Sequence, residues 1–148
     1  NNLHKMNISN DVSLLNKDSF IDFLNSVNSD FTPSLDKKIN FSEYYYKVIN
    51  NAKVIFIIEK KTIISLMVYY DNLDEAQITL VAVRNSYRGK KISYLLFESL
   101  FKLINKPINI ITWDDNTVSK KLYMKLGFII KNRYINKYGI SEVLMVKK

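Results

Sequence analysis

The sequence contains no cysteine, and this absence excludes disulfides, thiolate metal sites and a cysteine nucleophile. Its one histidine, His4, lies near the N-terminus, so a histidine-based triad or a multi-histidine metal site cannot be built; we expect no metal. No apolar run reaches the roughly 18 to 20 residues that span a bilayer, and the N-terminal stretch lacks the pattern of a secretory signal. These absences predict a soluble, cytoplasmic protein that makes no membrane contact.

The net charge of +8 has two interpretations. It fits an anionic partner such as nucleic acid or a phosphate-rich ligand. It fits equally well an AT-rich coding sequence, because Asn, Ile, Lys and Tyr are all abundant. The basic residues are scattered and no nucleic-acid-binding motif occurs, so we expect no nucleic-acid partner.

The length and composition fit one domain. A chain of 148 residues with 47% apolar residues can bury one core, and nothing in it indicates a linker or a repeat. We therefore predict a single domain over residues 1–148, with the polar residues 1–10 as a flexible segment.

The periodicity of apolar residues predicts a mixed fold. Strands rich in β-branched residues are expected in the centre and at the C-terminal end, and amphipathic helices on either side of them. The strands are predicted at 12–15, 53–60, 62–70, 76–83, 108–113, 128–135 and 142–147, and the helices at 17–27, 43–52, 91–105 and 116–128. Asp18 and Ser42 are expected to cap the first two helices. This order predicts an α/β fold with a mixed, mostly antiparallel central sheet and helices on both faces.

The stretch RNSYRGKKISYLLF, residues 84–97, leads from a predicted strand into a predicted helix. Free backbone N–H groups and the positive end of the helix dipole meet at such a junction and favour an anion. Arg88, Lys90 and Lys91 add positive charge there. The alternative interpretation is a solvated helix start.

The stretch NTVSKKLYMKLGF, residues 116–128, also follows a predicted strand. Asn116 opens the helix, and Tyr123 comes seven residues later, two turns on and near the same face. Taken alone, such a tyrosine before a Leu-Gly-Phe stop is usually part of the core. The two stretches occur in one small domain, each at a strand-to-helix step.

Taken together, the two motifs resemble those of the GCN5-related N-acetyltransferase (GNAT) family, over about Asn40 to Phe128. The resemblance implies that the loop after the fourth family strand holds the pyrophosphate of acetyl-CoA through its backbone amides. It also implies that the preceding strand end pairs with the pantetheine arm and polarises the acetyl carbonyl. The loop residues are Arg88, Gly89, Lys90, Lys91, Ile92 and Ser93, and the strand residues are Val81, Ala82 and Val83. Asn116 looks like a cofactor contact, and Tyr123 like the general acid.

This sequence departs from the family pattern at three positions. Lys91 stands at a family glycine and Ser93 at a glycine or alanine, and Ile111 stands where many members have a catalytic glutamate. A loop that binds phosphate through N–H groups tolerates a side chain wherever φ stays negative, which we expect for Lys91. Lys91 then adds a cation beside the phosphates.

The resulting prediction is an acetyl-CoA-dependent N-acetyltransferase that acts on a small-molecule or peptide amine. The alternative is a GNAT-like module that binds acyl-CoA with weak or no transfer. The base is left open between water and five carboxylates, those of Asp71, Asp74, Glu75, Asp114 and Asp115. Aromatic residues are expected near the acceptor, namely Tyr44, Tyr45, Tyr46, Tyr69, Tyr70 and Trp113. Open sheet edges are compatible with a homodimer.

Overall fold

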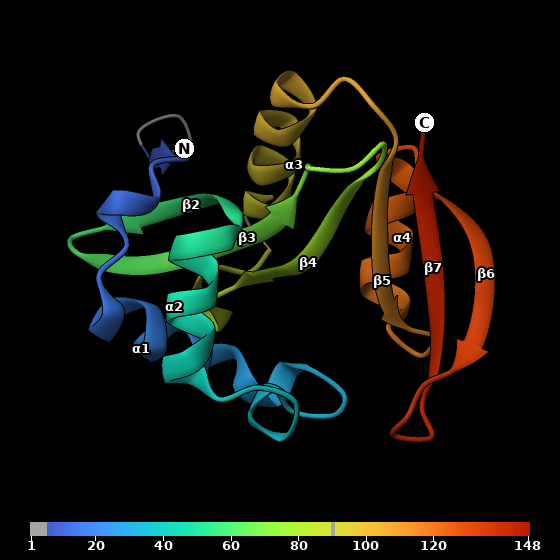
Figure 1. Cartoon of the computed structure of the whole chain (residues 1–148), viewed down its shortest axis with the longest axis horizontal. Coiled ribbons are helices and arrows are strands. Elements are labelled where there is room, and N and C mark those ends of the chain that lie inside the picture. Colours follow the sequence, from blue (N-terminus) through green and yellow to red (C-terminus); the bar gives the residue numbers. More distant parts are fainter. Residues whose placement is uncertain (1–5, 90) are drawn as a thin grey trace.

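The computed structural model describes residues 6–89 and 91–148, and within them seven strands form one sheet in the order β1-β2-β3-β4-β5-β7-β6 (Figure 1). The strands are β1 (Asn7–Ser9), β2 (Lys53–Glu59), β3 (Thr62–Tyr70), β4 (Ala76–Val83), β5 (Ile108–Trp113), β6 (Ile129–Ile135) and β7 (Ser141–Lys147). The helices are α1 (Lys17–Val27), α2 (Phe41–Asn51), α3 (Ile92–Leu103) and α4 (Thr117–Lys125). β4 and β5 run parallel and the other neighbouring strands antiparallel, which confirms the predicted mixed sheet.

The N-terminal part differs from the prediction. Asn7–Ser9 lie in the stretch predicted to be flexible, yet they form β1 and pair with β2. The strand predicted at 12–15 is wrong, because Val12–Leu14 form a 3-10 turn. The Asp11 side chain accepts a hydrogen bond from the Ser13 amide at 3.0 Å, and this cap closes the turn.

The caps of the first two helices also differ from the prediction. Asn16, and not Asp18, caps α1 by accepting a hydrogen bond from the Ser19 amide at 3.2 Å. Asn40 plays the same part for α2, in place of Ser42. The predicted limits of α1 are nevertheless correct, whereas α2 begins two residues earlier than predicted. Asparagine is as effective an N-cap as aspartate or serine.

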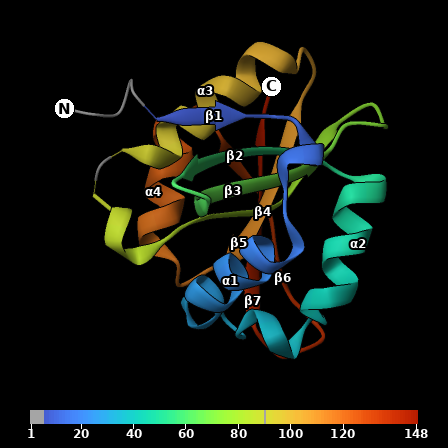
Figure 2. The ribbon, with the colours of Figure 1, turned by 90° about the vertical axis from the view of Figure 1, so that its left-hand side faces the viewer.

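The helices cover both faces of the sheet, as predicted. α2 lies on one side of β2, β3 and β4, and α3 and α4 lie on the other (Figure 2). Two buried clusters result: Phe20, Phe23 and Leu66 belong to the one under α1 and α2, whereas Phe97, Tyr123 and Phe128 belong to the one under α3 and α4. In the described residues, no helix is both long enough and apolar enough to cross a membrane.

The sheet opens between β4 and β5. These strands pair from Ala76 to Ile78 and from Ile108 to Ile110, and within the described strands the pairing stops there although both strands continue. Figure 1 shows them diverging beyond this point. The register of β3 and β4 also shifts there, with Val68 opposite Leu80 and Tyr69 opposite Ile78, which leaves one extra residue, a bulge, in β4. The narrow end of the gap therefore lies beside that bulge.

Ser65, in β3, is a buried polar residue without a partner. It is fully buried between Ile57 and Val83, which lie opposite it in β2 and β4, and its Oγ finds no hydrogen-bond partner in the described part of the chain. We expect Ser65→Ala to raise the free energy of unfolding by about 1 kcal/mol, because an unsatisfied buried hydroxyl is removed at little loss of volume. Urea denaturation measures this change.

Thr112→Val is the matched control for this prediction. Thr112 is also buried, but its Oγ1 accepts a hydrogen bond from the Asn116 side chain at 2.9 Å, so its replacement is expected to lower the stability. If Ser65→Ala destabilises the protein as much as Thr112→Val does, then the Ser65 hydroxyl has a partner and the prediction is wrong.

Candidate functional site

The edge of β4 that faces the gap carries backbone amides that do not pair with β3. The Arg84 amide donates to the Ile64 carbonyl at 2.8 Å, and bonded and non-bonded positions alternate along an antiparallel pair. It follows that Ala82 is hydrogen-bonded to β3, whereas the N–H groups of Val81 and Val83 point away from β3 and into the gap. Of the three strand residues predicted to contact a cofactor, these two present their amides to the gap.

The loop between β4 and α3 has a left-handed backbone at two positions. Gly89 has a φ of +78°, and Lys91, at the N-cap of α3, has a φ of 60° and a ψ of 27°. The prediction that Lys91 keeps a negative φ is therefore wrong. The chain reverses sharply from strand to helix here, and this reversal needs a conformation that glycine adopts most easily. The predicted site residue Lys90 lies outside the described residues.

The N-terminus of α3 is electropositive. Its first turn holds no acidic residue, and the exposed Lys91 side chain makes no capping hydrogen bond within the described residues. Ile92 is buried in the cluster under α3, and Ser93 is half-buried. The helix dipole and a cation thus coincide where neither is balanced by the described residues, and an anion would be stabilised at this point.

Two arginines fasten this loop to the α1 side of the molecule. Arg88 forms an ion pair with Asp30 and donates from Nε to the Val83 carbonyl at 3.3 Å. Arg84 forms an ion pair with Asp22 at 3.0 Å. The Arg88 side chain is thus engaged in positioning the loop. If Arg88 contacts a cofactor, as predicted, the contact is made by its backbone.

Tyr123 lies in the core beneath the gap. Its ring centroid is 5.7 Å from that of Phe97 and 6.0 Å from that of Phe128, and Val83 and Ile92 belong to the same buried cluster. Burial raises the pKa of Tyr123 to about 12, and a hydrogen bond with Ser119 opposes this rise. The phenol is therefore protonated at any physiological pH.

Asn116 is held in place by two hydrogen bonds. It is the N-cap of α4, where its Oδ1 accepts from the Ser119 amide at 3.4 Å and its Nδ2 donates to Thr112 Oγ1 at 2.9 Å. α4 thus starts at the end of β5 with Asn116 and presents Tyr123 two turns later. The structure brings Tyr123, Val81, Val83 and Ile92 together in one cluster, and Asn116 opens the same helix as Tyr123.

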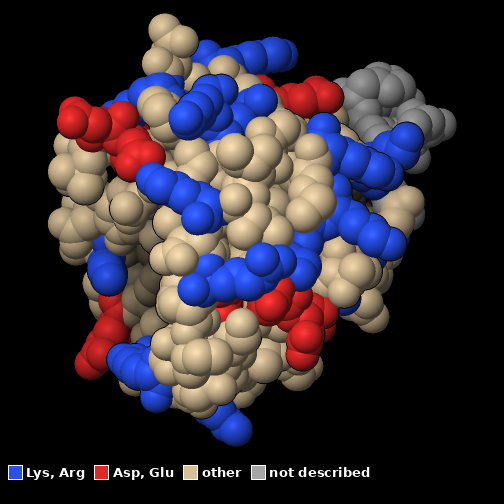
Figure 3. Space-filling view, turned by 90° about the vertical axis from the view of Figure 1, so that its right-hand side faces the viewer, with Lys and Arg blue, Asp and Glu red and all other residues tan. Residues whose placement is uncertain are grey.

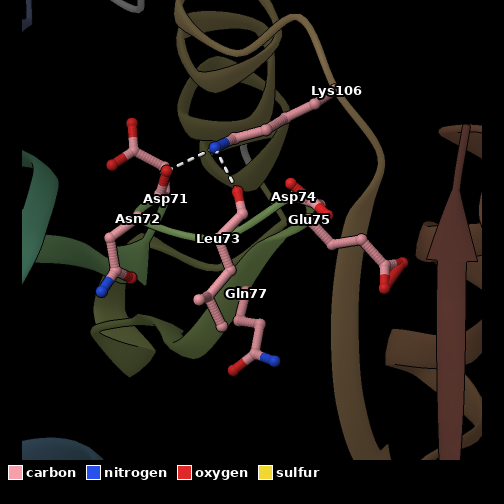
Figure 4. Close-up of a pocket in the computed structure, with 7 residues that line it drawn as sticks. All are labelled: Asp71, Asn72, Leu73, Asp74, Glu75, Gln77 and Lys106. Carbon is pink, nitrogen blue, oxygen red and sulfur yellow. Dashed lines mark hydrogen bonds between the residues drawn. The ribbon is translucent and has the colours of Figure 1, made fainter.

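Three of the candidate bases lie away from the open part of the gap. Asp71, Asp74 and Glu75 line a hollow of about 470 Å³ before β4, where Lys106 donates to the backbone carbonyls of Asp71 and Leu73 (Figure 4). The Asp71 carboxylate is also paired with Lys53 at 2.9 Å. Five residues of strand, about 16 Å, separate the start of β4 from Val81. None of the three is placed to take a proton directly at Val81.

The other two candidate bases follow β5. Asp114 forms ion pairs with Lys120 at 2.7 Å and with Arg133 at 3.5 Å. The hydrogen bond from the Lys120 ammonium lowers the pKa of Asp114, and Arg133 lowers it further, so this carboxylate is a weaker base than an ordinary aspartate. Asp115 is exposed to solvent.

Positive charge is concentrated in the C-terminal third of the chain. Residues 101–148 hold ten of the 22 Lys and Arg residues but three of the 14 Asp and Glu residues. Figure 3 shows many basic side chains on the side of the molecule where β6 and β7 lie. Since basic residues outnumber acidic ones there, this part of the chain carries net positive charge, which would attract an anionic ligand.

The family model of the acetyltransferase (GNAT) domain matches residues 29–148. The chain belongs to the GNAT acetyltransferase family. The match extends beyond both ends of the region that carries the two motifs, and it confirms the resemblance that they indicated. A comparison with curated proteins finds no match.

Solved GNAT structures share this fold. Aminoglycoside 6'-acetyltransferase type Ii has a TM-score of 0.78 and 19% sequence identity, over 97% of this chain and 97% of that chain. An aminoglycoside 6'-N-acetyltransferase complexed with coenzyme A has a TM-score of 0.76 and 15% identity, over 96% of each chain. A GNAT family acetyltransferase from Elizabethkingia anophelis with acetyl-CoA bound has a TM-score of 0.61 and 19% identity, over 72% of this chain and 82% of that chain. At these identities the likeness establishes the fold.

The three consecutive tyrosines of this GNAT protein face different surroundings. The Tyr44 phenol is hydrogen-bonded to Thr79, the Tyr45 phenol donates to the Leu15 carbonyl at 3.0 Å, and Tyr46 lies at the surface beside Lys17. Tyr44 is therefore the one of the three that reaches the gap region. Sequence reasoning missed Thr79, although a polar residue within the apolar stretch ITLVAV was a signal that could have found it.

Proposed function

We propose that this GNAT protein transfers the acetyl group of acetyl-CoA directly to a primary amine. The observation that carries the proposal is the gap between β4 and β5, with the N–H groups of Val81 and Val83 along its edge. The uncapped, basic N-terminus of α3 follows the same strand. An extended pantetheine arm fits such a strand edge, and a pyrophosphate fits such a helix end.

Each part of the site has one task in this proposal. The loop amides from Gly89 to Ser93 and the Lys91 ammonium hold the pyrophosphate, as Lys90 also does, and Asn116 contacts the pantetheine side. The amides of Val81 and Val83 bind the arm and donate to the acetyl carbonyl oxygen, where they stabilise the negative charge that develops there. Acetyl-CoA supplies a thioester whose carbonyl carbon accepts the amine.

Tyr123 acts at the sulfur. The CoA thiol has an ordinary pKa near about 8.5, so complete transfer of the proton from a tyrosine of pKa about 12 to the thiolate is uphill by about 5 kcal/mol. Tyr123 therefore remains protonated and stabilises the departing thiolate as a hydrogen-bond donor. This refines the role of general acid that the family resemblance implies.

The test is to incubate the purified protein with acetyl-CoA and a panel of primary amines, and to follow thiol release. Acetylated product with release of CoA supports the transferase. A thermal shift with CoA but no turnover on any amine would instead support the acyl-CoA-binding module. The absence of both CoA binding and turnover would contradict the proposed site itself.

A further inference from the structure

Thr79 and Tyr44 form a hydroxyl pair at the narrow end of the gap. Thr79 is the extra residue of the β4 bulge and follows Ile78, the last residue of β4 that pairs with β5. Its hydroxyl donates to the Val68 carbonyl at 3.4 Å and is also hydrogen-bonded to the Tyr44 phenol. Thr79 is exposed, and Tyr44 reaches it from α2.

This pair lies on the opposite face of the sheet from Tyr123. Tyr44 packs on Phe20, in the cluster under α1 and α2, whereas Tyr123 belongs to the cluster under α3 and α4. Across the gap on the Tyr44 side, Ile111 of β5 is 50% exposed and lies opposite Leu144 of β7. The gap thus opens onto both faces of the sheet. On the first face lies Tyr123, proposed to act at the thiol. On the second face, which we call the second side, the hydroxyls of Thr79 and Tyr44 lie on one wall and the apolar side chains of Ile111 and Leu144 on the other.

Several of the charged groups around the second side are already paired with one another. Glu75 is four strand residues from Thr79, about 13 Å along β4. The other ionisable groups on neighbouring elements are Tyr70, Asp71 with Lys53, Asp74, Lys106, Arg84 with Asp22, Arg88 with Asp30, Asp114 with Lys120 and Arg133, Asp115, Glu43 of α2, and Glu142 of β7. Burial raises the pKa of Tyr44, so its phenol is neutral at working pH. Thr79 and Tyr44 therefore offer an amine two neutral hydroxyls and no carboxylate.

Resting on the proposed function, we infer that Thr79 and Tyr44 position the acceptor amine, and that this acceptor is a weakly basic amine on an apolar group, bound in its neutral form. The hydroxyl oxygens accept hydrogen bonds from the amine, and Ile111 and Leu144 contact its apolar part. The N–C bond forms as the C–S bond breaks; the nitrogen then loses one proton to water, and the departing thiolate takes one up from water. No basic residue is needed to prepare the amine for attack, since it arrives deprotonated.

The experiment uses ring-substituted anilines and benzylamines with graded amine pKa, and measures kcat/KM for each as a function of pH. Without a base in the protein, kcat/KM rises tenfold per pH unit up to the pKa of each amine and then levels off, so that the break moves with the amine. A break at one fixed pH for all amines reveals a base in the protein and overturns the inference, as does turnover confined to multiply charged amines. If no amine of any class reacts, the proposed function itself fails.

Variants test the positioning role. Thr79→Val and Tyr44→Phe are each expected to raise the KM for the amine about tenfold, while the KM for acetyl-CoA and the pH of the break stay unchanged. Thr79→Ser restores the hydroxyl and should restore the KM. Tyr45→Phe is the matched control, because it removes a phenol on the same helix that bonds to Leu15. Lower thermal stability with an unchanged KM for the amine in both variants would show a structural role and overturn the assignment.

Discussion

Tyr123→Phe is expected to lower kcat by about 10- to 150-fold, the value of a hydrogen bond of about 1.5 to 3 kcal/mol to a charged group, and to leave the Kd for acetyl-CoA nearly unchanged. The phenol acts on the thiolate, which forms only as the C–S bond breaks, so its loss affects the transition state more than the bound substrate. The ring contacts with Phe97 and Phe128 do not involve the hydroxyl, so the fold should be retained. Steady-state kinetics and a binding titration measure the two effects.

The pH dependence of kcat tests the same role in the wild-type protein. With a folded-state pKa of about 12, Tyr123 stays protonated above pH 10, where an ordinary tyrosine ionises. We therefore expect no loss of kcat from this group as the pH passes through 10.

The control for Tyr123→Phe is Tyr138→Phe, which removes a phenol on the exposed β6–β7 turn. A kcat for Tyr123→Phe equal to that of the control would remove Tyr123 from the mechanism.

The central elements of the fold could be predicted because their apolar patterns are strong. The strands at 62–70, 76–83 and 108–113 have the predicted limits, since β-branched runs bounded by turn residues leave little choice of conformation. The residues before the first helix were harder to predict. β1 consists of three residues that pair with β2 through their backbones, and such pairing leaves almost no trace in the side chains.

In the site, too, features that depend on residue type could be predicted, whereas features that depend on backbone geometry could not. The motif residues around Gly89 and Asn116 could be found because their types and spacing are unusual. The bulge at Thr79 and the left-handed Lys91 could not, because register and φ are set by how distant strands and helices meet. The hydroxyl pair of Thr79 and Tyr44 joins residues 35 positions apart in the sequence, and only the folded chain brings them together.

Lys91→Glu is expected to raise the Kd for acetyl-CoA about 30-fold at low ionic strength, and Lys91→Gln about fivefold. One unit of charge near a phosphate at the protein surface is worth roughly 1 kcal/mol, and these two substitutions change the charge by two units and by one. Both effects should shrink as salt is added, because the Debye length falls from about 30 Å at 0.01 M to about 3 Å at 1 M. Isothermal titration over a range of salt concentrations measures them.

Lys91→Gly separates the charge of this residue from its backbone strain. A non-glycine residue in the left-handed region destabilises the folded state by about 1 to 2 kcal/mol. Glycine removes this strain, but part of the gain is offset because glycine also raises the conformational entropy of the unfolded chain. With a φ of 60° at this position, the variant should gain about 0.5 to 1 kcal/mol in stability, yet bind acetyl-CoA as weakly as Lys91→Gln. If instead all three variants bind with the wild-type Kd and salt dependence, the phosphates do not lie at the N-terminus of α3. If affinity falls in Lys91→Glu alone, repulsion by the new carboxylate, and not loss of the lysine ammonium, is the cause.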